Sequence, residues 1–139
     1  MELRGFSKTC RRGVAWAIAC AAVALLVGQV ASVLSAQAPA WQAYVTQFDD
    51  DGISVIDLQQ QTVVASVKTG RRPHGVAVAP DGSSVFVSNE GDGTLSIIDP
   101  RDYHVRATVP VGGAPHQIEV TRDGRHVLIP LNDKASVAV

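Results

Sequence analysis

Cysteine is almost missing from this chain, and its absence limits the chemistry open to most of the sequence. Only Cys10 and Cys20 are cysteines, and both lie in the leading segment 1–38. The remainder, residues 39–139, contains none. A disulfide framework, a thiol nucleophile and a cysteine-ligated metal or iron–sulfur site are therefore excluded there.

An excess of positive charge is also missing, because the whole chain has a net charge of −1. Residues 39–139 carry 8 Lys and Arg against 12 Asp and Glu, so they give no electrostatic case for binding nucleic acid. The sequence also lacks a nucleophile elbow, a Walker loop, a dinucleotide fingerprint and a zinc-protease HExxH helix. We therefore predict no catalytic residue, and an enzyme is the less favoured class.

The leading segment 1–38 differs in kind from the rest and is predicted to form a signal helix that directs export. A charge-free run rich in Ala, Val and Leu occupies residues 14–34, and Ala36-Gln37-Ala38 follows it as a small-residue cleavage pattern. The basic residues before the run are Arg4, Lys8, Arg11 and Arg12. This order is typical of a secretory signal peptide, so the protein is predicted to be periplasmic or secreted, with no membrane contact after cleavage.

Three details of the leader stay open. Because Pro39 would follow a cut after Ala38, a cut after Ser35 or Ala36 is a rival. The apolar run is just long enough to span a bilayer as an uncleaved anchor. The Arg11-Arg12 pair leaves the twin-arginine export route as an alternative to the general one.

The rest of the chain is a sequence repeat. Residues 44–85 align with residues 86–127 without a gap, and 15 of the 42 aligned pairs are identical. A third unit begins at residue 128. Each unit contains short, alternating, β-branched runs separated by turn residues, which indicates strands and not helices. The middle unit is predicted to form four antiparallel strands at about 74–79, 84–89, 95–99 and 105–111.

Four Asp-Gly pairs are predicted to supply the positive φ angles of tight hairpin turns. They are Asp51-Gly52, Asp81-Gly82, Asp92-Gly93 and Asp123-Gly124. A four-stranded antiparallel sheet that recurs with this 42-residue period lies within the range of a β-propeller blade. The sequence therefore predicts an all-β chain built of propeller blades.

These residues resemble the YVTN repeat of exported bacterial β-propellers. Tyr44-Val45-Thr46-Gln47 and Phe86-Val87-Ser88-Asn89 are similar to the signature, and the runs 70–78 and 80–82 match the rest of the repeat. The resemblance covers about residues 42–139 and implies the fold. Its functional implications are broader, because related propellers include lactonase-like enzymes, haem-binding redox propellers, partners of quinone-dependent dehydrogenases and proteins of unknown ligand.

The repeat count predicts an incomplete ring. Residues 39–139 amount to about 2.4 units, whereas such propellers usually close six to eight blades. A blade buries its faces only against neighbouring blades. We therefore expect either a fragment of a longer reading frame or a homo-oligomer in which several chains complete one ring.

His74 and His116 occupy equivalent positions in two units, each directly after a proline. In a propeller this position lies where the innermost strand begins, near the mouth of the central channel. The two imidazoles could converge there on a ligand or metal, although a zinc site needs three or four ligands. The alternative is structural: Pro-His fixes the turn into each blade while the ring nitrogens bond the backbone. No metal site is predicted, and haem is implied only by the family resemblance.

Arg71 and Arg72 break the repeat, since Gly113-Ala114 replace them in the next unit. A departure from a repeat is a pointer to function, so both arginines are candidates for contact with an anionic ligand. By contrast, Asp57 and Asp99 recur at matching strand ends and are predicted to stabilise turns. The acidic stretches 49–52 and 89–93 are predicted to be solvated hairpin tips and not calcium sites.

Together these features favour a binding or scaffolding module whose protein or small-molecule partner the sequence does not name. The alternatives are part of a lactonase-like hydrolase and part of a redox propeller that binds haem or serves a quinone-dependent dehydrogenase.

Overall fold

The structure is a computed structural model, and it describes residues 41–139. These residues form ten β-strands and one three-residue 3-10 turn, which confirms the predicted all-β class. The predicted signal helix, its cleavage positions, Cys10 and Cys20 lie outside the described residues. Within residues 41–139, no helix has the length and apolar character needed to span a membrane.

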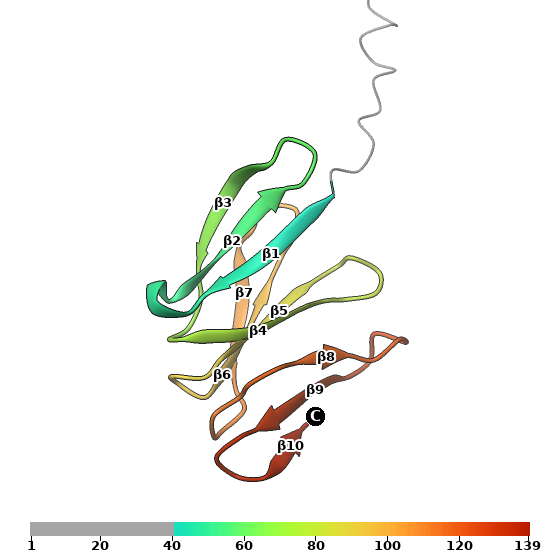
Figure 1. The fold of residues 1–139 in the computed structure, drawn as a ribbon. Helices are drawn as coiled ribbons and strands as arrows, with labels where there is room; N and C mark the ends of the chain where they lie inside the picture. The colour runs from blue at the N-terminus through green and yellow to red at the C-terminus, as the bar shows by residue number, and fades with distance from the viewer. Residues whose placement is uncertain (1–40) are drawn as a thin grey trace, which may run out of the picture. The chain divides into compact units, whose positions relative to one another are not determined.

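The strands form three antiparallel sheets, one after another along the chain (Figure 1). The first sheet contains β1 (Gln42–Gln47), β2 (Gly52–Asp57) and β3 (Thr62–Lys68), with the 3-10 turn η1 (Phe48–Asp50) between β1 and β2. The second contains β4 (Pro73–Val78), β5 (Val85–Asn89), β6 (Thr94–Ile98) and β7 (Val105–Pro110). The third contains β8 (Glu119–Val120), β9 (Val127–Leu131) and β10 (Ser136–Ala138).

The second sheet has the four strands that the sequence predicts, and each strand begins and ends within one residue of its predicted bounds. Successive side chains of each strand point to opposite faces of this sheet. On β5, Val85 and Val87 face the first sheet while Phe86 between them faces the third. This two-residue period is the pattern from which the strand was predicted.

The repeat of the sequence and the sheets of the structure are out of phase by one strand. The unit 44–85 supplies β1, β2 and β3 to the first sheet and then β4 to the second. In the same way, the unit 86–127 supplies β5, β6 and β7 and then β8 of the third sheet. Each unit is therefore tied to the next sheet by backbone hydrogen bonds as well as by side-chain packing.

Two apolar layers hold the three sheets together. Between the first and second sheets the buried side chains are Ile53, Val85, Val87 and Ile98, packed against Tyr44, Val67, Val76 and Val105. Between the second and third they are Leu95, Ile118, Ile129 and Leu131, packed against Ala77, Phe86, Val111, Val127 and Ala138. Because both faces of the second sheet are covered, it is the most buried of the three, as a blade between two neighbours should be.

All four Asp-Gly pairs supply a positive φ, as predicted, but not always on the glycine. Gly82, Gly93 and Gly124 have φ values of +70°, +68° and +69°. In the first pair it is Asp51 that takes the left-handed conformation, at φ +53°, while Gly52 starts β2. The difference arises because Asp51, not Gly52, stands at the repeat position of Gly93. Gly52 is required for another reason: a Cβ on it would lie 2.6 Å from the Val67 carbonyl oxygen.

Candidate functional site

The four predicted site residues lie at one end of the sheets. Arg71 and Arg72 belong to the loop from β3 to β4, His74 is the second residue of β4, and His116 follows the equivalent loop before β8. Hydrogen bonds tie these loops to the hairpin turns of the same end. We call the loops and turns of this end the loop rim, and His74 and His116 follow two of these loops. The loop rim comprises residues 48–51, 69–72, 90–93, 111–115 and 132–135.

Arg71 is held to the turn between β5 and β6. Its backbone N–H donates to Oδ2 of Asp92 at 2.8 Å, and its guanidinium donates to the carbonyl oxygen of Gly91 at 2.5 Å. Its own carbonyl accepts the N–H of Gly91 at 3.0 Å. The side chain is exposed but already engaged, so part of the role of Arg71 is to fasten the loop to its sheet.

Arg72 connects the first sheet to the second. Its backbone has φ +50° and donates its N–H to Oδ1 of Asp51 at 2.9 Å. Its guanidinium carbon lies 4.5 Å from the centre of the Phe48 ring, within the range of a cation–π contact. This exposed cation therefore stands in a defined place over an aromatic face.

The loop between the second and third sheets is also held by an aspartate, although it contains no arginine. The N–H of Ala114 donates to Oδ1 of Asp133 at 2.6 Å. The loop is close-packed here, because a Cβ on Gly113, whose φ is +71°, would lie 2.5 Å from the same carboxylate oxygen. In all three places, then, an aspartate of a hairpin turn fixes a backbone amide of the loop between two sheets.

The structure brings His74 and His116 together. Their ring centroids are 3.5 Å apart with an angle of 33° between the planes. The edge of the Phe48 ring meets His74 at a centroid distance of 6.2 Å. Nδ1 of His74 is buried and has no hydrogen-bond partner in the described part of the chain. The expectation that the ring nitrogens bond the backbone is therefore wrong for this atom, because stacking on His116 and not a hydrogen bond places the ring.

A hollow of about 450 Å³ opens beside this stack. It is lined by Thr46, Phe48, Pro73, His74 and Glu90. Three of these residues were missed by sequence reasoning: Thr46, Phe48 and Glu90. The sequence could have identified Phe48 as a candidate site residue, because its repeat equivalents, Glu90 and Asn132, are polar. An aromatic that replaces a polar residue on a turn breaks the repeat as clearly as the two arginines do.

Haem is implied by the family resemblance alone. A haem iron needs a ligand atom that points at it along the axis of the porphyrin. The rings of His74 and His116 lie against each other and Nδ1 of His74 is buried, so this nitrogen is not placed to be such a ligand. For a metal ion held by side chains, no three His, Cys, Asp or Glu residues gather within residues 41–139.

Asp57 and Asp99 lie at the opposite ends of the strands from the loop rim and serve turns. Oδ1 of Asp57 accepts the N–H groups of Gln59 and Gln60 at 2.8 and 2.9 Å. Oδ1 of Asp99 accepts the N–H of Arg101 at 2.9 Å. The turn role predicted for both carboxylates agrees with this geometry.

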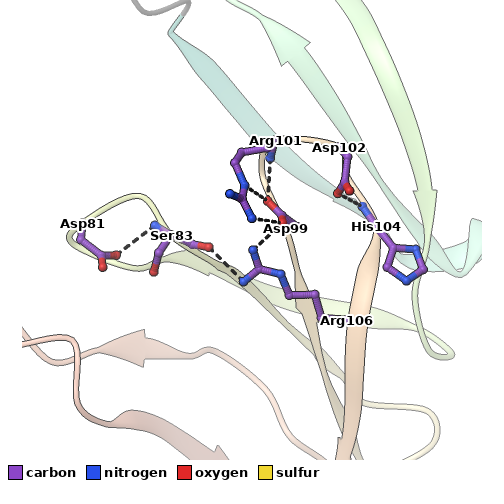
Figure 2. A network of polar contacts seen from close by, with 7 residues as sticks. All are labelled: Asp81, Ser83, Asp99, Arg101, Asp102, His104 and Arg106. Carbon is purple, nitrogen blue, oxygen red and sulfur yellow. Dashed lines mark hydrogen bonds and ion pairs between the residues drawn. The ribbon is translucent and has the colours of Figure 1, made fainter.

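Asp99 is also the centre of a small charged network (Figure 2). The Arg101 guanidinium donates to both of its oxygens, at 3.0 and 2.7 Å, and Arg106 donates to Oδ2. Arg106 reaches on to the carbonyl of Ser83 at 3.4 Å, which joins β7 to the turn between β4 and β5. These donors, with the Arg101 side chain first, hold the pKa of Asp99 well below its ordinary value of 3.8.

This network should make folding acid-sensitive. A carboxylate whose pKa is lowered by folding adds stability above its ordinary pKa, and that stability is lost as the pH falls through the lowered value. We therefore expect Asp99→Asn to lower the urea midpoint at pH 7 and the difference from wild type to shrink steadily below about pH 4. Asp102→Asn is the control, because Asp102 is exposed and accepts only the N–H of His104. Equal losses in the two variants would contradict the role of the network.

The fold resembles solved β-propellers, among them the WD40 β-propeller domain of Doa1, with a TM-score of 0.57 and 13% identity over 64% of this chain and 29% of that one. It resembles hydrazine synthase of Kuenenia stuttgartiensis with a TM-score of 0.63 and 22% identity, over 65% of this chain and 26% of that one. It resembles the dihydro-heme d1 dehydrogenase NirN with a TM-score of 0.63 and 24% identity, over 72% and 22% of the two chains. A Bacteroides fragilis protein named as a candidate 6-phosphogluconolactonase matches with a TM-score of 0.61 and 15% identity, over 69% and 30%.

At these identities the likeness concerns the fold alone, and the chain spans only between 22% and 30% of the length of these four proteins. No curated protein matches the sequence significantly. The family model of the YNCE-like β-propellers matches residues 8–137, which is most of the chain. Together with the repeat, the antiparallel sheets and the propeller neighbours, this match shows that the chain belongs to the YNCE-like β-propeller family.

Proposed function

We propose that the chain is part of an exported β-propeller that works as a binding or scaffolding module, with the loop rim as its binding surface. One observation supports this most: the rim is fixed in place before any ligand arrives. Asp92, Asp51 and Asp133 hold the amides of Arg71, Arg72 and Ala114, so the loops between sheets have little freedom to lose on binding. A preorganised surface keeps more of its contact energy as affinity.

The chemistry of the rim favours a partner with anionic or aromatic groups. Arg71 and Arg72 are exposed on it, and the Arg72 guanidinium carbon lies over the Phe48 ring. A guanidinium in this position offers its N–H edge to a carboxylate or phosphate and its outer face to a planar ring. Protein and small-molecule partners both remain within this proposal.

Export is the second part of the proposal and rests on the sequence of the leader. Its basic start, apolar run and small-residue end are those of a signal peptide, and the absence of cysteine from residues 39–139 is compatible with an oxidising compartment. The Sec and twin-arginine routes are both retained. Amino-terminal sequencing of the protein recovered from the periplasm or medium tests the cleavage.

A ligand screen tests the binding role. The purified protein is melted with a panel of anionic and aromatic compounds that includes lactones and haem. A compound that binds at the rim should raise the melting temperature of wild type, and Arg72→Ala should lose most of that rise. Arg122→Ala, an exposed arginine on the turn between β8 and β9, should keep it. A rise that survives in Arg72→Ala would place binding elsewhere.

The same purified protein also tests the two alternative functions, those of a lactonase-like hydrolase and of a redox propeller. Turnover of a lactone would favour a lactonase-like hydrolase, whose catalytic groups would then lie outside residues 41–139. A haem absorbance band that copurifies with the protein would favour a redox propeller.

A further inference from the structure

His74 is the residue at which the three sheets meet. Its strand β4 lies between β1 of the first sheet and β8 of the third (Figure 1). Its carbonyl oxygen accepts the hydroxyl of Thr46 on β1 at 3.2 Å, and its ring stacks on the ring of His116, which precedes β8. We call these two rings the histidine stack. A change in the stack therefore affects both junctions between sheets.

The histidine stack also supports the loop rim. The ring of His74 meets Phe48, and the Arg72 guanidinium lies over that same Phe48 ring. On the other side of the stack, the N–H of His116 donates to the carbonyl oxygen of Pro130 at 3.1 Å. The stack is thus linked to Arg72 through one aromatic ring and to the third sheet through the backbone.

The surroundings of His74 favour a neutral ring. Its Nδ1 is buried and has no hydrogen-bond partner in the described part of the chain. A neutral imidazole with its proton on Nε2 leaves only an acceptor unpaired at Nδ1. A protonated imidazole would place a charged N–H donor there with nothing to accept it, and this costs considerably more than an unpaired neutral acceptor.

The second ring of the stack adds to this cost. The centroids of His74 and His116 are 3.5 Å apart, so two protonated rings would bring like charges into contact. Protons bind to such a pair as a unit, and the first disfavours the second. The folded stack is therefore expected to bind at most one proton, whereas each imidazole of the unfolded chain binds its own.

The charged groups around the stack do not reverse this preference. Glu90 lines the same hollow as His74 but gives Nδ1 no hydrogen bond, and its charge favours a protonated ring. Arg72, over Phe48, opposes a protonated ring. The other charged residues on the adjoining turns, loops and strands are exposed or bound to a loop amide, so water and salt screen them. They are Asp49, Asp50, Asp51, Arg71, Asp92, Glu119, Asp133 and Lys134.

We propose that the histidine stack is a pH-sensitive contact that holds the three sheets and the loop rim together while neutral and is weakened by mild acid. Because the unfolded chain binds more protons at these two residues, stability falls as the pH falls below about 6.5, where histidine is ordinarily protonated. Asp99 acts in a separate window, below about pH 4. As a regulation of binding, this proposal rests on the function proposed for the rim.

Urea unfolding of the purified protein at pH 7.5 and pH 5.5 tests the stack. The unfolding equilibrium constant of wild type should rise by about tenfold for each imidazole that the fold keeps neutral. The double variant His74→Phe/His116→Phe keeps two rings that cannot take a proton, so its constant should change less than about twofold. The matched control is His104→Gln/His126→Gln, which replaces two exposed histidines and should respond as wild type does.

Nuclear magnetic resonance of wild type with ¹³C- and ¹⁵N-labelled histidine gives a second measurement that does not depend on the variants. His104 and His126 should titrate in the folded protein, while His74 should stay neutral at pH 5.5 with its proton on Nε2. A wild type equally stable at both pH values, an equal response in the double Phe variant, or a protonated His74 in the folded protein would each overturn the proposal. Neither measurement uses a ligand, so failure of the stack is distinct from failure of binding at the rim.

Discussion

Gly75→Ala is expected to destabilise the folded chain by about 2–3 kcal/mol, a large loss for one added methyl group. The new Cβ would lie 2.7 Å from the His116 carbonyl oxygen and 2.9 Å from the Ile118 nitrogen. Both are backbone atoms of the next sheet, so they give way only if the second and third sheets move apart. That movement would open the apolar layer around Leu95 and Ile129, which is why the cost should reach the upper part of the range for overpacking.

Urea unfolding followed by circular dichroism measures this loss. Gln117→Ala is the control, because Gln117 stands at the same repeat position in the third sheet and its side chain is exposed. It should change the unfolding free energy by less than about 0.5 kcal/mol. If Gly75→Ala were as mild as the control, the close contact between the sheets would not exist in solution.

Asn89→Ala is expected to destabilise the chain by about 2–4 kcal/mol, through lost hydrogen bonds and an unpaired hydroxyl. Nδ2 of Asn89 donates to Oγ1 of Thr94 and to Oγ of Ser96, each at 2.9 Å. Ser96 is fully buried and has no other side-chain partner among the described residues. Removal of the amide therefore leaves this hydroxyl without a hydrogen bond and leaves a cavity where Asn89 was.

The repeat again provides a control at an equivalent position. Gln47 stands where Asn89 does, but it ends β1, which pairs with β2 alone among the described strands, and it is half-buried. Gln47→Ala should cost less than about 1 kcal/mol in the same urea experiment. Asn89→Ser separates the two causes, because a serine can bond one hydroxyl and should recover part of the loss. An unchanged midpoint in Asn89→Ala would show that the buried amide contributes nothing.

The side chain of Asn89 also explains why residue 70 is a glycine. A Cβ on Gly70 would lie 2.6 Å from both Cγ and Nδ2 of Asn89 and 2.6 Å from Oδ2 of Asp92. Gly70 is one of the residues that recur in the repeat, as Gly112. Gly70 thus has a packing cause in the second sheet, whereas Gly112 is a glycine because its φ is +73°. The sequence alone presents both only as turn signals.

Strand positions were predictable because they depend on local pattern. Alternating β-branched residues and Asp-Gly turns gave the four strands of the second sheet to within one residue. In Asp51-Gly52 the positive φ falls on the aspartate and not on the glycine, because this pair stands one residue out of register with Asp92-Gly93 in the repeat. Which residue takes a positive φ depends on the register of the hairpin, and that register is set by the pairing of β1 with β2.

The candidate site was only half predictable. Equivalent positions in a repeat indicated that His74 and His116 would lie near each other, but not that their rings would stack at 3.5 Å. Arg71 and Arg72 were selected because they break the repeat, yet their backbone bonds to Asp92 and Asp51 join residues that are far apart in the sequence. Such contacts depend on how one sheet packs on another, which no local pattern records.

The propeller fold of this protein, its 42-residue period and the absence of cysteine from residues 39–139 can all be read from the sequence without a structure. These properties follow from composition and from patterns of residues close together in the sequence, and neither depends on how the strands pack. The tertiary structure was needed to show that the repeat and the sheets are out of phase by one strand, that aspartates fix the loop rim, and that a hollow opens beside the stacked rings of His74 and His116. Those features arise where two sheets meet, so they exist only once the strands are placed in space.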